Sequence, residues 1–354
     1  MTYMRSPLKK DEDDKILDWL SPTDYGLQQT DLSRRHQSGT GQWLLESTDY
    51  QAWIKEPNKT LFCPGIPGSG KTFLTSIVIR NLQEKFRGET GVEITYVYCS
   101  SQRQDSQNAE GLLCSLLRRL AYKNSPLPSS IRKLHSRHIQ KGTTPSLDEI
   151  FRALRSTLAL SSRAFIIIDA LDECQVPDAC CMKLLSAIFH LQSKAGMNIF
   201  ATSRPVPEIM TRFQGSLSIT IRATESDICQ YLYGHMNELP VCYMGNSAEL
   251  QVEIVRVISN AANGRFLLAQ VCFESLRDKY TINDVEEVLG NLSASSGAYD
   301  NTYRKAVEQI KRQGPDQEEF AKRVLSRITF AGGQLTNLEI QNELVLKTSE
   351  LELD

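Results

Sequence analysis

The chain has 354 residues, of which 41% are hydrophobic and 23% charged, and its formal net charge is −2. This length exceeds one compact core and predicts two or three domains of ordinary soluble composition. The near-neutral charge gives no basic field for nucleic acid, and no apolar run is long enough to span a membrane. Nine cysteines without a C-x-x-C pair argue against zinc, and with no secretory signal they indicate a reducing, cytoplasmic location.

Residues 1–35 are predicted to form an N-terminal tail and linker. Positions 1–15 are polar, with Lys9 and Lys10 balanced by four acidic residues, and we expect them to be mobile. A short helix is predicted after Ser47 and before Pro57. Its aromatic residues are expected to pack on a neighbouring domain rather than to contact a ligand.

Residues 65–72 fit the pattern G-x-x-x-x-G-K-[ST] at every fixed position. In such a loop, glycines let backbone N–H groups approach phosphate oxygens, and the positive end of the following helix faces the same anion. We expect the lysine to reach the β- and γ-phosphates of a nucleotide and the threonine hydroxyl to ligate Mg²⁺. The predicted nucleotide-binding residues are Gly65, Ile66, Pro67, Gly68, Ser69, Gly70, Lys71 and Thr72.

The flanking pattern predicts an α/β fold with a parallel sheet. β-prone apolar runs recur at 60–63, 92–99, 164–169, 197–204 and 217–221, and the segments between them have helical spacing. Right-handed crossovers then join the strands into one parallel sheet. The segment 129–140 carries a basic face, which we interpret as a solvated surface rather than a nucleic-acid site. From Glu225 onward only helices are predicted, over 225–239, 248–262, 265–279, 282–290, 298–313 and 316–330.

Three acidic residues follow the apolar run that ends at Ile168. Mg²⁺ bound to a triphosphate needs a carboxylate at the end of a strand beside the phosphate loop, and Asp169 has that position. We therefore predict a metal site formed by Thr72 and Asp169. Asp172 or Glu173 is predicted to polarise the attacking water, and the sequence leaves the choice between them open.

Arg204 ends the next predicted strand. Because ligands of such sheets lie beyond the carboxyl ends of the strands, its guanidinium is expected to touch the γ-phosphate and to report whether it is there. No Asn/Thr-Lys-x-Asp segment follows the fourth strand, so the usual means of selecting guanine is missing and adenine is favoured. The expected cofactors are ATP or ADP and Mg²⁺.

With these residues in place, the chain resembles the fungal group of NACHT-type signal-transducing NTPases, relatives of animal and plant nucleotide-binding immune receptors. The resemblance covers residues 36 to about 345. It is carried by the phosphate loop, by residues 166–173 with the small Ala170 after the metal aspartate, and by three further stretches. These are Gly39-Thr40-Gly41-Gln42-Trp43-Leu44-Leu45, Ala201-Thr202-Ser203-Arg204-Pro205 and Asn263-Gly264-Arg265-Phe266-Leu267-Leu268-Ala269.

The resemblance implies a nucleotide-binding domain over 36–223, a helical domain over 224–296 and the beginning of a winged helix over 297–354. It also implies a switch that closes over ADP at rest and opens with ATP to form a homo-oligomer, with protein partners that the sequence does not identify. The Leu-Pro-rich turn of the family is replaced here by residues 292–297, and the family's winged-helix histidine has no counterpart.

Three functions remain open at this point. The leading hypothesis is a slow ATPase that acts as a molecular switch in immune or cell-death signalling. A scaffold that binds nucleotide without turnover is the alternative. A P-loop kinase would need an acceptor site and a lid with arginines, and neither can be identified in the sequence.

Overall fold

The computed structural model describes residues 7–100, 107–123, 126–174, 180–240, 248–294 and 315–330. The chain divides into two compact units, Met1–Arg222 and Ala223–Asp354. The helix predicted over 298–313 and the end of the predicted winged-helix region, 331–354, lie outside the described residues.

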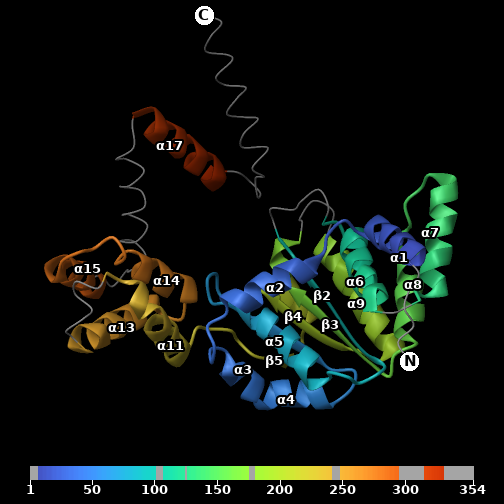
Figure 1. Ribbon diagram of the computed structural model, residues 1–354, viewed down its shortest axis with the longest axis horizontal. Helices are drawn as coiled ribbons and strands as arrows, with labels where there is room; N and C mark the ends of the chain where they lie inside the picture. Colours follow the sequence, from blue (N-terminus) through green and yellow to red (C-terminus); the bar gives the residue numbers. More distant parts are fainter. Residues whose placement is uncertain are drawn as a thin grey trace, which may run out of the picture. The chain divides into compact units, whose positions relative to one another are not determined.

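A sheet of five parallel strands forms the centre of the first unit, in the order β2-β3-β4-β1-β5 (Figure 1). The strands are β1 (Thr60–Pro64), β2 (Val92–Tyr98), β3 (Arg163–Asp169), β4 (Asn198–Ser203) and β5 (Leu217–Ser218). Every residue of β1 and β4 is buried, as is typical of strands covered on both faces. The predicted parallel α/β fold is confirmed.

Helices cover both faces of this sheet. The connection from β1 to β2 crosses the sheet in one direction and the later connections cross it in the other, so right-handed crossovers place their helices on opposite faces. On one face α5 (Lys71–Lys85) contacts β2, β3 and β4. The helices of the later connections are α6 (Ala109–Lys123), α7 (Ser129–Lys141), α8 (Leu147–Leu158), α9 (Cys180–Ala195) and α10 (Pro207–Arg212).

Strand β4 lies between β1, which leads into the phosphate loop, and β3, which ends at Asp169. One strand therefore lies between the acidic strand and the strand that leads into the phosphate loop. Cys63 pairs with Thr202 on one side of β4, and Ile168 pairs with Ala201 on the other. The end of β4 thus lies between the ends of β1 and β3.

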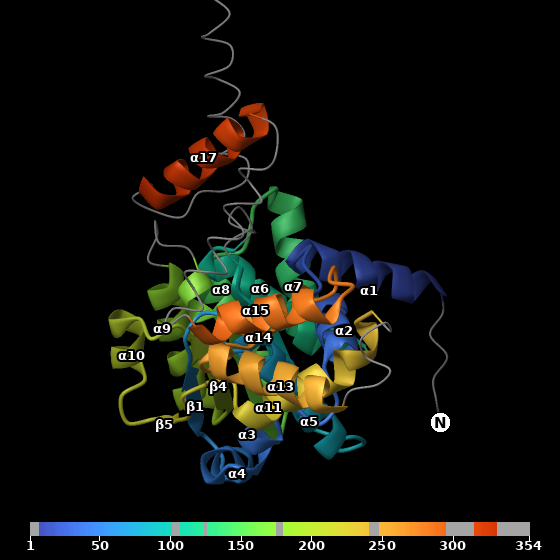
Figure 2. The same cartoon turned by 90° about the vertical axis from the view of Figure 1, so that its left-hand side faces the viewer.

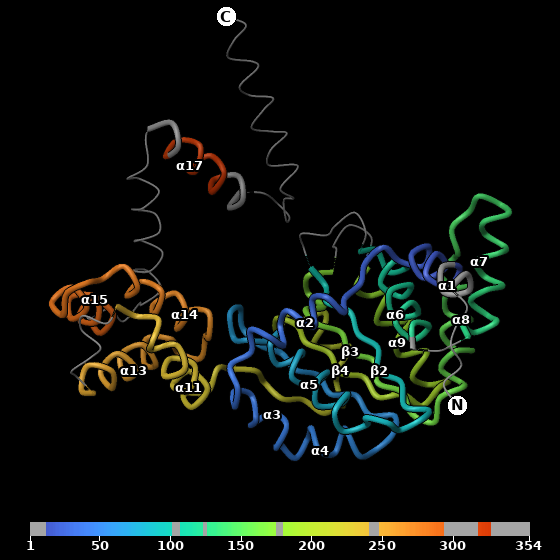
Figure 3. The backbone as a smooth tube through the Cα atoms, in the orientation of Figure 1, coloured from blue at the N-terminus to red at the C-terminus, as the bar shows by residue number. Residues whose placement is uncertain are grey.

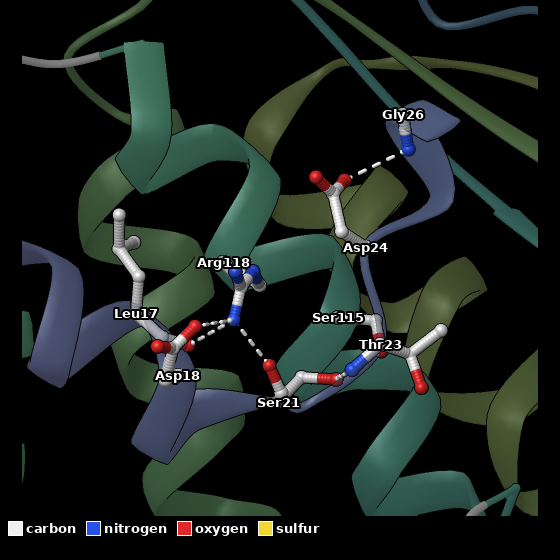
Figure 4. Close-up of polar contacts among 8 residues, drawn as sticks. All are labelled: Leu17, Asp18, Ser21, Thr23, Asp24, Gly26, Ser115 and Arg118. Atoms are coloured by element: carbon white, nitrogen blue, oxygen red, sulfur yellow. Dashed lines mark hydrogen bonds and ion pairs between the residues drawn. The ribbon is translucent and has the colours of Figure 1, made fainter. Parts of the chain in front are cut away.

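The N-terminal segment is helical and belongs to the first unit, so the prediction of a mobile tail is wrong for residues 7–15. Helix α1 (Pro7–Leu20) and helix α2 (Tyr25–Arg35) precede the sheet, and Figure 3 traces them into the following helices. Ile16 and Leu17 are buried in the core of this unit. Arg118 of α6 fixes the turn after α1, donating to the Leu17 carbonyl at 2.8 Å and to the Asp18 carboxylate at 2.9 Å (Figure 4).

The basic face of α7 is only partly solvated, contrary to the sequence interpretation. His138 is buried, lies 3.2 Å from the Glu149 carboxylate and stacks on Trp19 of α1. Arg132 forms an ion pair with the buried carboxylate of Asp13. Half of this face therefore packs against α1, which lies beside α7 in Figures 1 and 2.

The aromatic residues before the first strand pack in the core, as predicted. They lie on α4 (Thr48–Lys55), which follows the short helix α3 (Gln42–Glu46). Tyr50 and Trp53 are fully buried, and the Trp53 ring contacts Phe165 of β3 and Phe200 of β4 at its edges. Helix α4 thus closes one end of the sheet.

Replacing Tyr50 by Phe should lower the free energy of unfolding by about 1 kcal/mol. The Tyr50 hydroxyl donates to Asn81 Oδ1 of α5 at 2.8 Å, and the change leaves that amide oxygen without its donor while the ring stays packed. Urea unfolding followed by circular dichroism measures the loss. Tyr122→Phe, at an exposed position of α6, is the matched control and should leave the stability unchanged. Equal stability of the two variants would contradict the prediction.

The second unit consists of helices in its described residues, as predicted for the region after Glu225. They are α11 (Glu225–His235), the 3-10 turn η3 (Met236–Glu238), α13 (Ala248–Ala262), α14 (Phe266–Glu274), α15 (Ile282–Ala294) and α17 (Pro315–Phe330). Ile254, Ile258 and Phe273 are buried at the centre of its core. Asn263 and Gly264 have positive φ and end α13, as the sequence indicated. No helix in the described part of the chain is long and apolar enough to cross a membrane.

Candidate functional site

The loop from Gly65 to Gly70 joins β1 to α5. Gly68 and Gly70 have φ angles of 75° and 94°, a conformation that strongly favours glycine. Gly65 has no room for a side chain, because a methyl group there would lie 2.7 Å from Ser69 Oγ and 2.9 Å from the Ile221 carbonyl oxygen. Gly70 caps α5 without a side-chain hydrogen bond, so the first N–H groups of the helix receive no acceptor from the cap. This arrangement suits an anion at the start of α5.

The Lys71 side chain folds back over the loop. Its Nζ donates to the Gly65 carbonyl at 2.8 Å and to the Ile66 carbonyl at 3.1 Å. Burial lowers the pKa of the Lys71 ammonium, and the nearby carboxylates of Asp172 and Asp169 oppose that change. Ser69 Oγ is buried and has no hydrogen-bond partner among the described residues. The loop therefore holds a cation and a buried hydroxyl close to its backbone N–H groups, which fits a phosphate group.

Three threonine hydroxyls surround the Asp169 carboxylate at the end of β3. Thr72 donates to Oδ2 at 2.7 Å, and Thr75 and Thr202 donate to Oδ1, each at 2.7 Å. Asp169 is 2% exposed, and its burial raises the pKa while the three hydroxyls lower it. Thr202 also accepts from the Ala170 backbone N–H at 2.9 Å. The carboxylate is thus held in one orientation, with the phosphate-loop threonine on one of its oxygens.

Asp172 and Arg204 form an ion pair across the ends of β3 and β4. The Arg204 backbone N–H donates to Asp172 Oδ1 at 2.7 Å, and Arg204 Nε lies 2.8 Å from Asp172 Oδ2. The Asp172 side chain is 6% exposed, while that of Arg204 is 46% exposed. The aspartate is therefore the fixed partner, and it positions an arginine that remains accessible.

The turn that carries Asp172 depends on Ala170. Ala170 has φ 53°, which is uncommon for a residue with a side chain, and it is buried. It starts the 3-10 turn η2 (Leu171–Glu173). The turn reverses the chain directly after β3, so that Asp172 faces β4 and Glu173 is partly exposed beside it. A larger or β-branched residue at position 170 would be strained here.

The stretch before the sheet that carries part of the family resemblance packs against α5. Gly41 has φ 76°, and a methyl group there would lie 2.6 Å from Ile77 Cδ1 and 2.8 Å from Leu74 Cδ2. His36 Nδ1 lies 3.1 Å from Arg80 Nη2, also on α5. This turn thus sits directly on the helix whose start forms the phosphate loop.

The structure brings the predicted site residues together at the carboxyl ends of β1, β3 and β4. Residues 65–72 form the loop, Thr72 contacts Asp169, and Asp172 contacts Arg204, beside Glu173. Two residues of this site were not predicted, namely Thr75 and Thr202, which both donate to Asp169. Thr75 stands three positions after Thr72 and therefore lies on the same side of α5. This spacing could have indicated a second hydroxyl donor to Asp169. Thr202 could have been identified from its position near the end of the apolar strand β4.

One family model matches the part of the chain that carries this site. The model of the family described as "Nephrocystin 3, N-terminal" matches residues 39–204, slightly less than half of the chain. No curated protein sequence matches this chain.

Solved structures with a similar fold include a Walker-type ATPase of Pyrococcus abyssi, with 15% identity and a TM-score of 0.48 over 84% of this chain and 82% of that one. The Orc1 protein of Aeropyrum pernix in complex with DNA has 16% identity and a TM-score of 0.46, over 96% and 82%. Cdc6p of Pyrobaculum aerophilum has 16% identity and a TM-score of 0.43, over 73% and 64%. These likenesses are too distant to carry an argument about what this chain does.

Proposed function

We propose that this chain is an adenine-nucleotide-binding NTPase that hydrolyses ATP slowly and acts as a nucleotide-dependent switch. The observation that supports it most is the 2.7 Å hydrogen bond between Thr72 of the phosphate loop and Asp169 at the end of β3. The sequence pattern predicted these two residues, 97 positions apart, as the two contributors to one Mg²⁺ site.

The residues fit a magnesium nucleotide in the following way. Thr72 and Asp169 supply the oxygen ligands that Mg²⁺ prefers, Thr72 directly and Asp169 through bound water. Lys71 exchanges its two carbonyl contacts for phosphate oxygens, and the N–H groups at the start of α5 donate to the same phosphates. Bound Mg²⁺ would neutralise charge on the β- and γ-phosphates. Thr75 and Thr202 keep the Asp169 carboxylate in place for this role.

The geometry favours Glu173 over Asp172 as the group that accepts a proton from the attacking water, a choice that the sequence left open. Asp172 Oδ1 accepts the Arg204 backbone N–H and Oδ2 forms the ion pair with Arg204 Nε, so both oxygens of that carboxylate are already engaged. Glu173 lies next to it on the same turn and is partly exposed. We assign Asp172 to holding Arg204, and Glu173 to the proton transfer.

Arg204 is assigned to sensing the γ-phosphate. Its guanidinium is 46% exposed and lies at the end of β4, between the phosphate loop and Asp169. Contact with the γ-phosphate would compete with or add to its ion pair with Asp172. A protein can switch with a nucleotide only when that nucleotide binds its two states differently, and an arginine that contacts ATP but not ADP supplies this difference.

The Arg204→Ala variant should weaken ATP about fivefold while ADP affinity stays unchanged. Only ATP carries the phosphate that Arg204 is proposed to contact, and a partly exposed ionic contact is worth about 1 kcal/mol. Fluorescence titration with both nucleotides measures the ratio. Arg212→Ala is the control, since Arg212 lies on α10 and its guanidinium donates to Ser186 at 2.6 Å. An equal loss for ATP and ADP would show that Arg204 is only structural.

A scaffold that binds nucleotide without turnover is the alternative, and a P-loop kinase is the less favoured one. Phosphate release with and without a pool of small-molecule acceptors separates the three. A switch releases phosphate slowly whether or not acceptors are present, a kinase forms a phosphorylated product, and a scaffold does neither. Identification of the nucleotide that co-purifies with the chain tests the preference for adenine.

The finer assignment to a fungal NACHT-type switch in immune or cell-death signalling rests on the resemblance of the sequence stretches. It predicts a monomer with ADP and a homo-oligomer with ATP, which light scattering after gel filtration measures. The absence of nucleic-acid binding stays a prediction from the net charge of −2. Fluorescence anisotropy with labelled DNA and RNA tests it.

A further inference from the structure

A cleft of about 390 Å³ lies at the edge of the sheet, away from the phosphate loop and the acidic turn. We call it the Arg119 cleft. Its walls come from α2, the end of α5, the edge strand β2 and α6, and none of the predicted nucleotide-site residues lines it. Its volume is in the range of small-molecule and peptide sites. Its lining includes Asp24, Gly26, Leu27, Tyr96, Arg119 and Tyr122.

Arg119 is a largely buried cation with little compensation. Its guanidinium carbon lies 3.6 Å from the centroid of the Tyr96 ring, which covers one face. Its Nε is buried and has no hydrogen-bond partner among the described residues, and no carboxylate of those residues lies within ion-pair distance of it. Its neighbour Arg118 differs, because it donates to Leu17, Asp18 and Ser21 (Figure 4). Two adjacent arginines of one helix thus have opposite environments.

Such a guanidinium is costly to bury. Desolvation disfavours its charged form and lowers the pKa of Arg119, and Tyr96 and the Asp24 carboxylate offset only part of this effect. A planar guanidinium with open donors is suited to a carboxylate, which can accept two of its N–H groups at once. The arrangement is therefore complete only with an acceptor that comes from outside the described residues.

Asp24 and Arg118 are the other charged groups that line the cleft, and Asp24 restricts what that acceptor can be. The Asp24 carboxylate is exposed, and its Oδ1 accepts the Gly26 N–H at 2.8 Å at the start of α2 (Figure 4). A methyl group on Gly26 would lie 3.3 Å from Arg119 Nη1, so the guanidinium reaches this end of α2. Arg118 is engaged by the Leu17 carbonyl and the Asp18 carboxylate, which leaves Arg119 beside the one carboxylate of Asp24. This balance disfavours a doubly charged phosphate and suits a single carboxylate. Asp24 can in turn accept an N–H next to that carboxylate.

The rim of the cleft adds an apolar requirement. Leu27 is 76% exposed and Tyr122 is 74% exposed, and both line the cleft. Exposed apolar side chains around a charged centre are typical of peptide recognition, in which a central polar contact is shielded from water by its surroundings. A carboxylate, a neighbouring N–H and an adjacent apolar group occur together in a peptide that contains Asp or Glu beside a Leu-like residue.

We propose that the Arg119 cleft binds a peptide segment of a partner protein, with an Asp or Glu side chain on Arg119 and an apolar neighbour between Leu27 and Tyr122. The proposal does not depend on the nucleotide site.

Two synthetic peptides test this site, acetyl-Leu-Glu-Leu-amide and its matched control acetyl-Leu-Gln-Leu-amide. Titration followed by NMR of the full chain should show binding of the Glu peptide, and about tenfold weaker binding of the Gln peptide, because the Gln side chain lacks the charge. Arg119→Gln should remove this preference. Arg155→Gln, at an exposed arginine of α8, should keep it. Equal binding of both peptides to the unaltered chain would overturn the proposal.

Sodium acetate and inorganic phosphate distinguish a peptide site from a simple anion site. Acetate should compete with the Glu peptide only weakly, because it lacks the apolar neighbours, and phosphate should not compete. If acetate alone binds as well as the peptide, the cleft takes small carboxylates and the peptide assignment is wrong. If phosphate displaces the peptide at lower concentration than acetate, the argument from Asp24 is wrong.

A stability measurement separates a binding role from a structural one. Arg119→Met removes a desolvated charge that has no ion-pair partner among the described residues while keeping a long side chain over Tyr96, so the Tm should rise by about 2–4 °C. The Glu peptide should raise the Tm of the unaltered chain but not that of the variant. A lower Tm for Arg119→Met, without a peptide effect on the unaltered chain, would show that Arg119 only supports the fold.

Discussion

The Glu173→Gln variant should bind ATP as tightly as the unaltered chain and hydrolyse it about 100- to 10,000-fold more slowly. Removing a group that accepts a proton only in the transition state lowers the rate without weakening the ground-state complex. Single-turnover phosphate release measures the rate, and titration with ATP measures the affinity. The isosteric amide keeps the size of the side chain, so the turn after β3 should persist.

Asp172→Asn is the companion variant, because it alters the neighbouring carboxylate of the same turn. It should act through Arg204, whose backbone N–H donates to Asp172 and whose Nε forms an ion pair with it, and should reduce the difference between ATP and ADP affinity. If Asp172→Asn abolishes hydrolysis while Glu173→Gln does not, the two roles are exchanged. If neither variant changes the rate, the acidic turn takes no part in hydrolysis.

The Lys71→Ala variant should lose about tenfold to a hundredfold in affinity for adenine nucleotides. Lys71 is the cation of the phosphate loop, and a charge-assisted contact to phosphate is worth about 1.5–3 kcal/mol. The loss should be similar for ATP and ADP if the lysine contacts the β-phosphate, and larger for ATP if it also contacts the γ-phosphate. Isothermal titration in the presence of Mg²⁺ distinguishes these cases.

Lys85→Ala is the matched control for this variant. Lys85 is in the last turn of the same helix α5, opposite the phosphate loop, so its removal should leave nucleotide affinity unchanged. An unaltered affinity of Lys71→Ala, or an equal loss in Lys85→Ala, would contradict the assignment of the loop as the nucleotide site.

Local sequence was sufficient to predict the parallel sheet, and it singled out the candidate site residues. The phosphate loop is one contiguous motif, and the runs before Asp169 and Arg204 are apolar enough to identify buried strands. What the sequence could not predict were contacts between distant positions. Asp172 and Arg204 were both singled out, yet their pairing depends on β4 lying beside β3. The strand order, with β4 inserted next to β1, is a tertiary property that no single run of residues encodes.

The failures at the N-terminus have the same origin. Residues 9–14 are all charged, so composition favoured a solvated tail. Asp13 is nevertheless buried, because Arg132 of α7 neutralises it from 119 positions further along the chain. The apolar stripe of α1 is short, and the helix is stabilised by its packing on α6 and α7. The interpretation of α7 as a solvated basic face was wrong for His138 and Arg132, because their partners lie on α1 and α8.

The burial of α1 and α2 bears on how this protein can be shortened. The family match begins at residue 39, which would be a natural place to start a fragment for expression. Such a fragment would lose Ile16, Leu17, Tyr25 and Leu32 from the core and leave the apolar side of α6 facing water. It would also remove one wall of the Arg119 cleft. Fragments intended to retain the nucleotide unit intact should therefore start at or before Pro7.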